Sequence, residues 1–195
     1  MRVAVIILGL LFQVFLAHSQ MPNKFIDKFM GLKFASSKQQ VVNLAKLKKG
    51  IYAKGSSSQN TLSYSNMTFS GKPAFRVAFT FVENKLYEGR IFFKVDHKQK
   101  ILNQYAEILS GIEEVYGESE TNERKYEYPY SDGDVDAWVA ISNNYATISD
   151  TWIDRVTPSA IKLFILDDGD LICLWYQQSD LQETASKAST LKSDY

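Results

Sequence analysis

Cysteine and histidine are nearly absent from this sequence. Its 195 residues include one cysteine, Cys173, and two histidines, His18 and His97. A single cysteine excludes an intramolecular disulfide, and so few cysteine and histidine side chains exclude a zinc site built from nitrogen and sulfur ligands. We therefore expect Cys173, in the apolar run 171–175, to be a small buried side chain in a fold that its hydrophobic core stabilises.

An excess of charge of either sign is also missing. The 22 basic and 22 acidic side chains give a formal net charge of zero and a pI near 6.7. Proteins that bind nucleic acid need a basic surface to replace the phosphate counterions, so this composition argues against such a partner. Hydrophobic residues make up 45% of the chain and aromatic residues 13%. These fractions exclude a disordered chain, and the length predicts one ordinary domain.

The first nineteen residues have the pattern of a removable secretory signal. Arg2 supplies a positive charge, residues 3–16 are almost wholly apolar, and residues 17–19 place small side chains at the two positions that a signal peptidase reads. A membrane anchor is the alternative, but the apolar run is shorter than the ~20 residues that span a bilayer. We therefore predict cleavage between Ser19 and Gln20, a secreted or periplasmic protein, and no later membrane span.

The first half of the remaining chain has the pattern of a helix followed by strands. Ser37 and Gln40 form a capping box at the start of the helix, and Gly50 marks its end. The strongest strand signal is a hairpin in which apolar and polar residues alternate on both sides of the turn 83–85. The predicted strands of this half are 61–64, 67–70, 75–81 and 87–95.

The second half repeats this plan. A wide apolar stripe over residues 101–116 predicts a long helix that ends at Gly117. Its predicted strands are 125–130, 138–141, 147–153, 161–165 and 171–175. The fold class that follows is α+β, with a mainly antiparallel sheet covered on one face by two helices.

The matching halves have two interpretations. Either an α-β-β-β unit is duplicated, with half-repeats at about 35–96 and 97–178, or the similarity is one that α+β domains show by chance. In both cases we predict a single α+β domain over residues 20–178. Residues 179–195 form a polar C-terminal tail, for which a short helix capped by Ser179 and a frayed end are equally open.

The tandem helix-then-sheet layout of residues 31–178, in a secreted chain of this size, resembles the beta-lactamase-inhibitor-protein-like and BamE-like envelope proteins. Its local features are the capped helix at 37–44 and the two final hairpins. The resemblance implies a sheet that is covered by helices on one face and binds other proteins. The chain lacks the lipidated N-terminal cysteine of the lipoprotein members, so the resemblance implies no outer-membrane anchor and assigns no functional residue.

Catalytic groups are scarce. Signal cleavage would leave His97 as the single histidine, in a turn where we expect it to be exposed. The motif G-x-S-x-G is absent, and the acidic pairs Glu113-Glu114 and Glu118-x-Glu120 are only neighbours along the chain, which is weak support for a glycosidase. We therefore predict that the protein is not an enzyme, with a carboxylate-dependent hydrolase as the least favoured alternative.

Acidic turns are the only candidate metal sites. Asp132, Asp134 and Asp136 fall at every second position and offer oxygen ligands of the kind that calcium prefers. The EF-hand pattern fails, because its glycine position holds Ala137 and its final glutamate position holds Asn143. Asp-Gly is also an ordinary turn sequence, so a solvated hairpin turn is the alternative. A second, weaker cluster of the same kind comprises Asp167, Asp168 and Asp170.

Tyrosines provide the strongest functional signal. Tyr126, Tyr128 and Tyr130 share one face if residues 125–130 form a strand. Such a row can anchor a protein partner or stack on sugars, since tyrosine combines rigid apolar area with a hydroxyl group. The structural alternative is an ordinary sheet face on which aromatic residues stabilise strand pairing.

The last predicted strand adds one more residue to this set. Trp175 and Tyr176 are consecutive, so they point to opposite faces and one of them faces solvent or an interface; we include Tyr176 among the binding residues. The sequence thus predicts a non-enzymatic protein that binds an envelope or extracellular protein through an aromatic-rich sheet face. The alternative is a carbohydrate-binding accessory module that uses the same tyrosines, with calcium as a possible ligand.

Overall fold

Each half of the chain contributes four strands to the main sheet and one helix that covers it. The structure, a computed structural model, describes residues 25–134, 136–166 and 169–193, so the predicted signal peptide lies outside the described residues. The first half comprises helix α2 (Lys38–Leu47) and strands β3 (Ile51–Tyr52), β4 (Thr61–Ser65), β7 (Arg76–Val82) and β8 (Lys85–Lys94). The second half comprises helix α3 (Ile101–Tyr116) and strands β9 (Thr121–Tyr126), β10 (Ala146–Asp154), β11 (Ser159–Ile165) and β12 (Leu171–Gln178).

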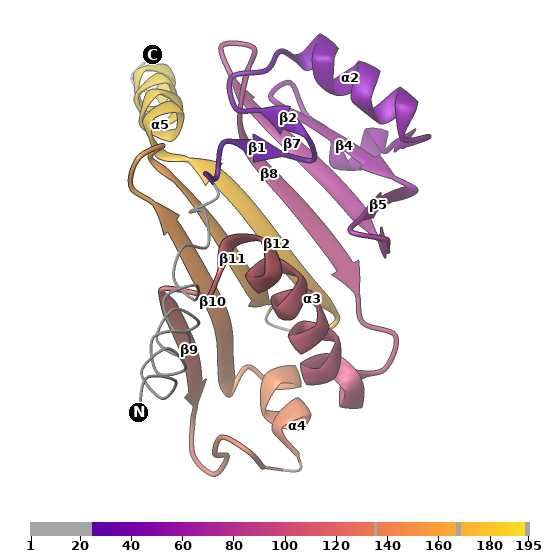
Figure 1. The fold of residues 1–195 in the computed structure, drawn as a ribbon, viewed down its shortest axis with the longest axis vertical. Helices are drawn as coiled ribbons and strands as arrows, with labels where there is room; N and C mark the ends of the chain where they lie inside the picture. The colour runs from indigo at the N-terminus through magenta and orange to yellow at the C-terminus, as the bar shows by residue number, and fades with distance from the viewer. Residues whose placement is uncertain (1–24, 135, 167–168, 194–195) are drawn as a thin grey trace, which may run out of the picture.

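These strands form one antiparallel sheet of eight in the order β3-β4-β7-β8-β12-β11-β10-β9 (Figure 1). The last strand of each half is therefore central, and β8 pairs with β12 from Glu88 opposite Gln177 to Lys94 opposite Leu171. Helices α2 and α3 lie in front of the same face of the sheet (Figure 1). The predicted α+β class with a mainly antiparallel sheet is confirmed. The mirrored strand order is compatible with a duplication, whose half-repeat boundaries stay a prediction.

Smaller elements extend this framework. Two short hairpins lie on the helix-covered side, and two short 3-10 turns and two further helices complete the chain. These elements are β1 (Lys28–Phe29), β2 (Leu32–Lys33), β5 (Met67–Phe69), β6 (Lys72–Ala74), η1 (Lys54–Ser56), η2 (Lys98–Lys100), α4 (Ala137–Ser142) and α5 (Ser179–Ser193). The segment predicted as a polar tail is thus helix α5 as far as Ser193. In the part of the chain that the structure describes, none of the helices is both long and apolar enough to cross a membrane.

The main core fills the space between the sheet and its two helices. Helix α3 contributes buried residues at positions 101, 105, 108 and 112, because its apolar side chains recur at helical spacing. The strands contribute every second residue, since side chains alternate between the two faces of a sheet. Fully buried strand residues of this core include Val77, Phe79, Ile91, Ile161, Leu163, Ile172 and Leu174.

Two of the predicted strands are wrong. Residues 138–141 lie in helix α4, where the buried residues Ala137, Ala140 and Ile141 follow a spacing of three and four. The predicted strand 125–130 is displaced, because β9 ends at Tyr126 and a cis peptide bond joins Tyr128 to Pro129. Pro129 has no backbone N–H to donate to a strand ladder, which favours an end of the pairing before it.

The helix cap at Ser37 supports a first prediction. The Ser37 hydroxyl accepts a hydrogen bond from the Gln40 N–H at 3.4 Å, and the Gln40 side-chain oxygen accepts one from the Ser37 N–H at 2.8 Å. We expect Ser37→Ala to lower the free energy of unfolding by about 1 kcal/mol, because the first turn of α2 loses its side-chain acceptor. Urea denaturation would measure this loss. Ser36→Ala is the control, and an equal loss there would contradict a role of the cap.

Candidate functional site

A second hydrophobic cluster lies on the sheet face opposite α2 and α3, which we call the open face. Its buried members are Ala78, Phe92 and Cys173, one from each of three adjacent strands. Their alternation with main-core residues such as Val77, Ile91 and Leu174 places them on the other side of the sheet. Partly buried residues packed against this cluster are Phe164, Leu166, Leu171 and Trp175.

Three cations lie over aromatic rings of the open face. The guanidinium of Arg76 lies 4.3 Å from the centroid of the Phe92 ring, which is its partner across β7 and β8. The guanidinium of Arg90 lies 5.5 Å from the ring of Trp175, its partner across β8 and β12.

The third pair lies on the next strand: the Lys162 ammonium is 5.8 Å from the ring of Phe164. Cation–aromatic contacts of this kind contribute about 0.5–1 kcal/mol each when exposed, enough to favour one orientation of a long side chain.

Arg90 is held in place by further contacts. It forms a 3.0 Å ion pair with Glu88, whose own carboxylate also accepts a hydrogen bond from the Thr80 hydroxyl at 3.1 Å. The Glu88 side chain is 9% exposed, whereas that of Arg90 is 44% exposed. The arginine is therefore fixed on one side by a nearly buried acid and by an indole ring, and it presents its remaining N–H groups to solvent.

Two hollows flank this pair. One of about 420 Å³ is lined by Arg76, Arg90 and Thr80 together with Ser63. The other, of about 770 Å³, lies between Trp175 on the sheet and helix α5, which contributes Gln182, Ala185 and Ser186. Helix α5 contacts β7, β8 and β12, so it covers the end of the open face where Glu88 pairs with Gln177.

Cys173 is not a nucleophile on this face. Its side chain is 1% exposed, and burial raises the pKa of its thiol to about 12 despite the opposing effect of Arg90 and Arg76. The thiolate is the reactive form of cysteine. The predicted role of Cys173 as a small buried side chain is confirmed.

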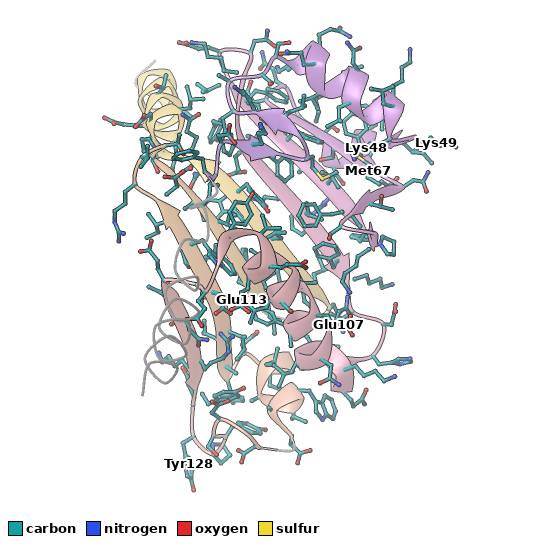
Figure 2. All side chains as sticks on the ribbon, in the orientation of Figure 1. Lys48, Lys49, Met67, Glu107, Glu113 and Tyr128 are labelled. Carbon is teal, nitrogen blue, oxygen red and sulfur yellow. The ribbon has the colours of Figure 1, made fainter. Side chains whose placement is uncertain are left out.

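The predicted tyrosine row does not exist. Tyr126 is partly buried against the main core, Tyr130 stacks on Tyr145 with ring centroids 5.8 Å apart, and Tyr128 is 95% exposed. Figure 2 shows Tyr128 projecting from the end of the molecule beyond β9. The three side chains therefore share no sheet face, because the strand ends before two of them.

Tyr176 is on the covered face, so its predicted place at an interface is wrong. Its side chain is 3% exposed and packs 5.4 Å from the ring of Phe29. Burial is the main cause that raises the pKa of its hydroxyl well above 10.0, and the neighbouring Tyr116 is the second cause. Trp175, the other member of the consecutive pair, is the one on the open face.

The predicted calcium ligands do not converge. The Asp134 carboxylate accepts hydrogen bonds from the backbone N–H and the hydroxyl of Ser131, at 2.6 and 3.0 Å. Asp132 and Asp136 are exposed, and the described residues contain no group of three or more histidine, cysteine or acidic side chains placed to hold a metal ion. In the second acidic turn, Asp170 forms an ion pair with Lys98 at 3.1 Å, and Asp167 and Asp168 lie outside the described residues.

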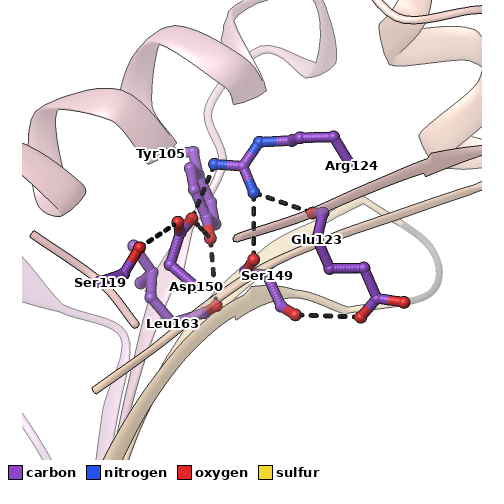
Figure 3. A network of polar contacts seen from close by, with 7 residues as sticks. All are labelled: Tyr105, Ser119, Glu123, Arg124, Ser149, Asp150 and Leu163. Carbon is purple, nitrogen blue, oxygen red and sulfur yellow. Dashed lines mark hydrogen bonds and ion pairs between the residues drawn. The ribbon is translucent and has the colours of Figure 1, made fainter. Parts of the chain in front are cut away.

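A cluster of titratable groups is buried under helix α3 (Figure 3). The Asp150 carboxylate accepts hydrogen bonds from the Tyr105 hydroxyl at 2.6 Å and the Ser119 hydroxyl at 3.0 Å, and forms a 2.7 Å ion pair with Arg124. Burial and the hydrogen bond to Asp150 raise the pKa of the Tyr105 hydroxyl. Because Asp150 is 0% exposed, a substrate cannot reach it. The cluster joins α3, β9 and β10 and is structural.

Comparison with known proteins does not assign this chain to a family. No protein family, no curated protein and no solved structure matches the chain. The resemblance in layout to the beta-lactamase-inhibitor-protein-like and BamE-like envelope proteins therefore stays a prediction. The sequence does not predict the open face; its available signal is that Arg76, Arg90 and Lys162 each directly precede an apolar residue of the main core along their strands.

Proposed function

We propose that this protein is a secreted or periplasmic, non-enzymatic binding protein that engages another protein through the open face. The observation that carries the proposal is the row of cation–aromatic pairs formed by Arg76 with Phe92, Arg90 with Trp175, and Lys162 with Phe164. Tryptophan and arginine are the residue types most enriched among interface positions of high binding energy. Secretion rests on the predicted signal peptide.

The arrangement also suits binding in energetic terms. The side chains of the open face are ordered before any partner arrives, because each cation rests on a ring and Arg90 is additionally bonded to Glu88. Ordering a long side chain on association costs about 0.5–1.5 kcal/mol, and a surface that is already ordered avoids much of that cost.

The non-enzymatic part of the proposal rests on how titratable groups are placed. Asp150 is sealed beneath α3, the Cys173 thiol is buried and protonated, and His97 is an exposed residue of a turn. General acid–base catalysis needs a titratable group within hydrogen-bond reach of a substrate, in a site that also positions it. A carboxylate-dependent hydrolase is for this reason the weakest of the three candidates.

A carbohydrate-binding module is the second candidate, and Tyr128 favours it. Its ring is 95% exposed, and a free aromatic face can stack on a sugar. The rings of Phe164 and Trp175 on the open face are partly buried, so they offer less free ring surface than Tyr128 does.

Affinity capture with single-residue variants would test the proposal. The purified protein serves as bait for native envelope and culture fluid, with cross-linking. We expect Trp175→Ala to weaken retention of an enriched partner by about 30-fold or more, the effect of removing a central interface residue. Tyr128→Ala is the matched control and should retain the partner, with circular dichroism to show that both variants fold. Loss of the partner in Tyr128→Ala with retention in Trp175→Ala would contradict the proposal and favour binding through Tyr128.

A further inference from the structure

The open face is cationic in a protein whose net charge is zero. Strand register places eight charged residues on this side of the sheet, and six of them are basic. The basic residues are Arg76, Lys85, Arg90, Lys94, Lys125 and Lys162, and the acidic residues are Glu88 and Glu123. Such an asymmetry on one face attracts a partner of opposite charge and raises its rate of association.

The cations of the open face are largely unneutralised. Among the described residues, Arg90 forms an ion pair with Glu88, but no carboxylate lies within ion-pair distance of Arg76 or Lys162. The Arg76 Nε and Trp175 Nε1 atoms are buried and find no acceptor in the described part of the chain. These two atoms have almost no exposed surface, so acceptor oxygens of a partner would instead meet the exposed guanidinium of Arg90, whose side chain is 44% exposed.

The two halves of the open face differ in polarity. The β7–β8 side presents Arg76, Arg90 and Thr80, whereas the β11–β12 side presents an apolar patch. The apolar patch comprises the partly buried side chains of Phe164, Leu166, Leu171 and Trp175, which surround the buried Cys173. A sulfated glycan could neutralise the cations but has no apolar groups to cover this patch, while a polypeptide supplies both kinds of side chain.

We infer that the partner presents an acidic polypeptide segment, with carboxylates toward Arg76 and Arg90 and apolar side chains toward Phe164 and Trp175. Carboxylates suit this position because the planar guanidinium group binds them through two parallel hydrogen bonds. The inference rests on the proposed function and specifies the chemistry of the protein that the open face binds.

Helix α5 limits where such a segment lies. It covers the end of the sheet where Gln177 pairs with Glu88, and the chain continues into α5 directly from β12. The opposite end, where Leu171 pairs with Lys94, carries a further cation and a partly buried apolar side chain. The acidic segment therefore lies over the part of the face between Trp175 and Leu171.

Binding of synthetic peptides to the purified protein would test the inference. The probes are a fluorescein-labelled decapeptide of alternating glutamate and leucine, the same peptide with glutamine for glutamate, the same peptide with lysine, and heparin. We expect the acidic peptide to bind about tenfold or more tightly than the glutamine and lysine peptides, and the difference to shrink as salt is raised. Fluorescence anisotropy gives the dissociation constants, and unlabelled heparin is measured by competition.

Variants locate the binding on the open face. We expect Arg76→Gln combined with Lys162→Gln to weaken binding of the acidic peptide by about tenfold. Neither substitution leaves a carboxylate without its cation among the described residues, because neither residue forms an ion pair there. Arg155→Gln is the matched control, because Arg155 is an exposed arginine paired with Glu120 away from this face, and it should bind as the parent does. Melting temperatures would show that all the variants are folded.

Three results would overturn the inference. They are equal binding of the acidic and glutamine peptides, unchanged binding in the double variant, and binding of heparin but not of the acidic peptide. If the acidic peptide fails to bind while Trp175→Ala still releases the captured protein, the acidic chemistry is wrong and the proposed function stands. If Trp175→Ala retains the captured protein, the proposed function itself is wrong.

Discussion

Arg124→Met is expected to lower the free energy of unfolding by about 3–5 kcal/mol, a large part of the stability of an ordinary domain. Asp150 is 0% exposed and its carboxylate lies 2.7 Å from the Arg124 guanidinium. Methionine keeps much of the packing volume but removes the only cation in ion-pair contact with that carboxylate among the described residues. Guanidinium denaturation would measure the loss, which also corresponds to a melting temperature lower by roughly 6–20 °C.

Two further variants separate the buried charge from other effects. Arg155→Met removes an arginine whose side chain is 77% exposed from its pair with Glu120, and should cost about 0–1 kcal/mol. Adding Asp150→Asn to Arg124→Met should restore part of the stability, because an amide remains polar enough to bond with Tyr105 and Ser119 but carries no charge. Equal losses in Arg124→Met and Arg155→Met would show that the ion pair does not stabilise the fold.

The elements with a strong local period were predictable from the sequence. Helix α3 was predicted because its apolar residues recur every three or four positions and Gly117 ends it with φ of 84°. Strands β7 and β8 alternate over a long span, and the turn between them holds Glu83 and Asn84 at positive φ. In such segments the local preference and the global packing agree.

Where the signal was short, the prediction failed. Helix α4 has six residues, and a short apolar run such as 138–141 cannot be assigned to helix or strand by period alone. The strand predicted over the three tyrosines is wrong for a different reason. Pro129 interrupts the segment and has no backbone N–H for the ladder, and the alternation of tyrosines does not reveal this.

The contacts of the open face could not be predicted, because they depend on pairing between distant segments. Arg90 meets Trp175 only because β8 pairs with β12, about 85 residues further along the chain. Alternation did show that Trp175 and Tyr176 face opposite ways. It did not show which side the helices cover. The sequence therefore suggested Tyr176 as a binding residue, whereas Trp175 is the residue on the open face.

The contact between the first hairpin and the centre of the sheet supports a second large effect, for Gly89→Ala. A Cβ atom at Gly89 would lie 2.1–2.3 Å from three ring carbons of Phe29. Phe29 is 0% exposed and packs against Phe79 and Tyr176, so its ring has no free space to enter. We expect a loss of about 3–5 kcal/mol, as large as removing the ring, because the added methyl group forces Phe29 out of its site. Thermal denaturation followed by circular dichroism would measure it.

The contribution of Phe29 can be isolated by a double-mutant cycle. Phe29→Ala alone should cost about 3–5 kcal/mol, since it leaves a cavity on the covered face of the sheet. In that background Gly89→Ala should cost almost nothing, because the obstructing ring is gone. Gly111→Ala is the matched control: its Cβ would enter open space on α3, and it should stabilise the protein by about 0.5–1 kcal/mol. Additive losses at Phe29 and Gly89 would contradict this account, because they would mean that strand β8 rejects alanine for a reason of its own.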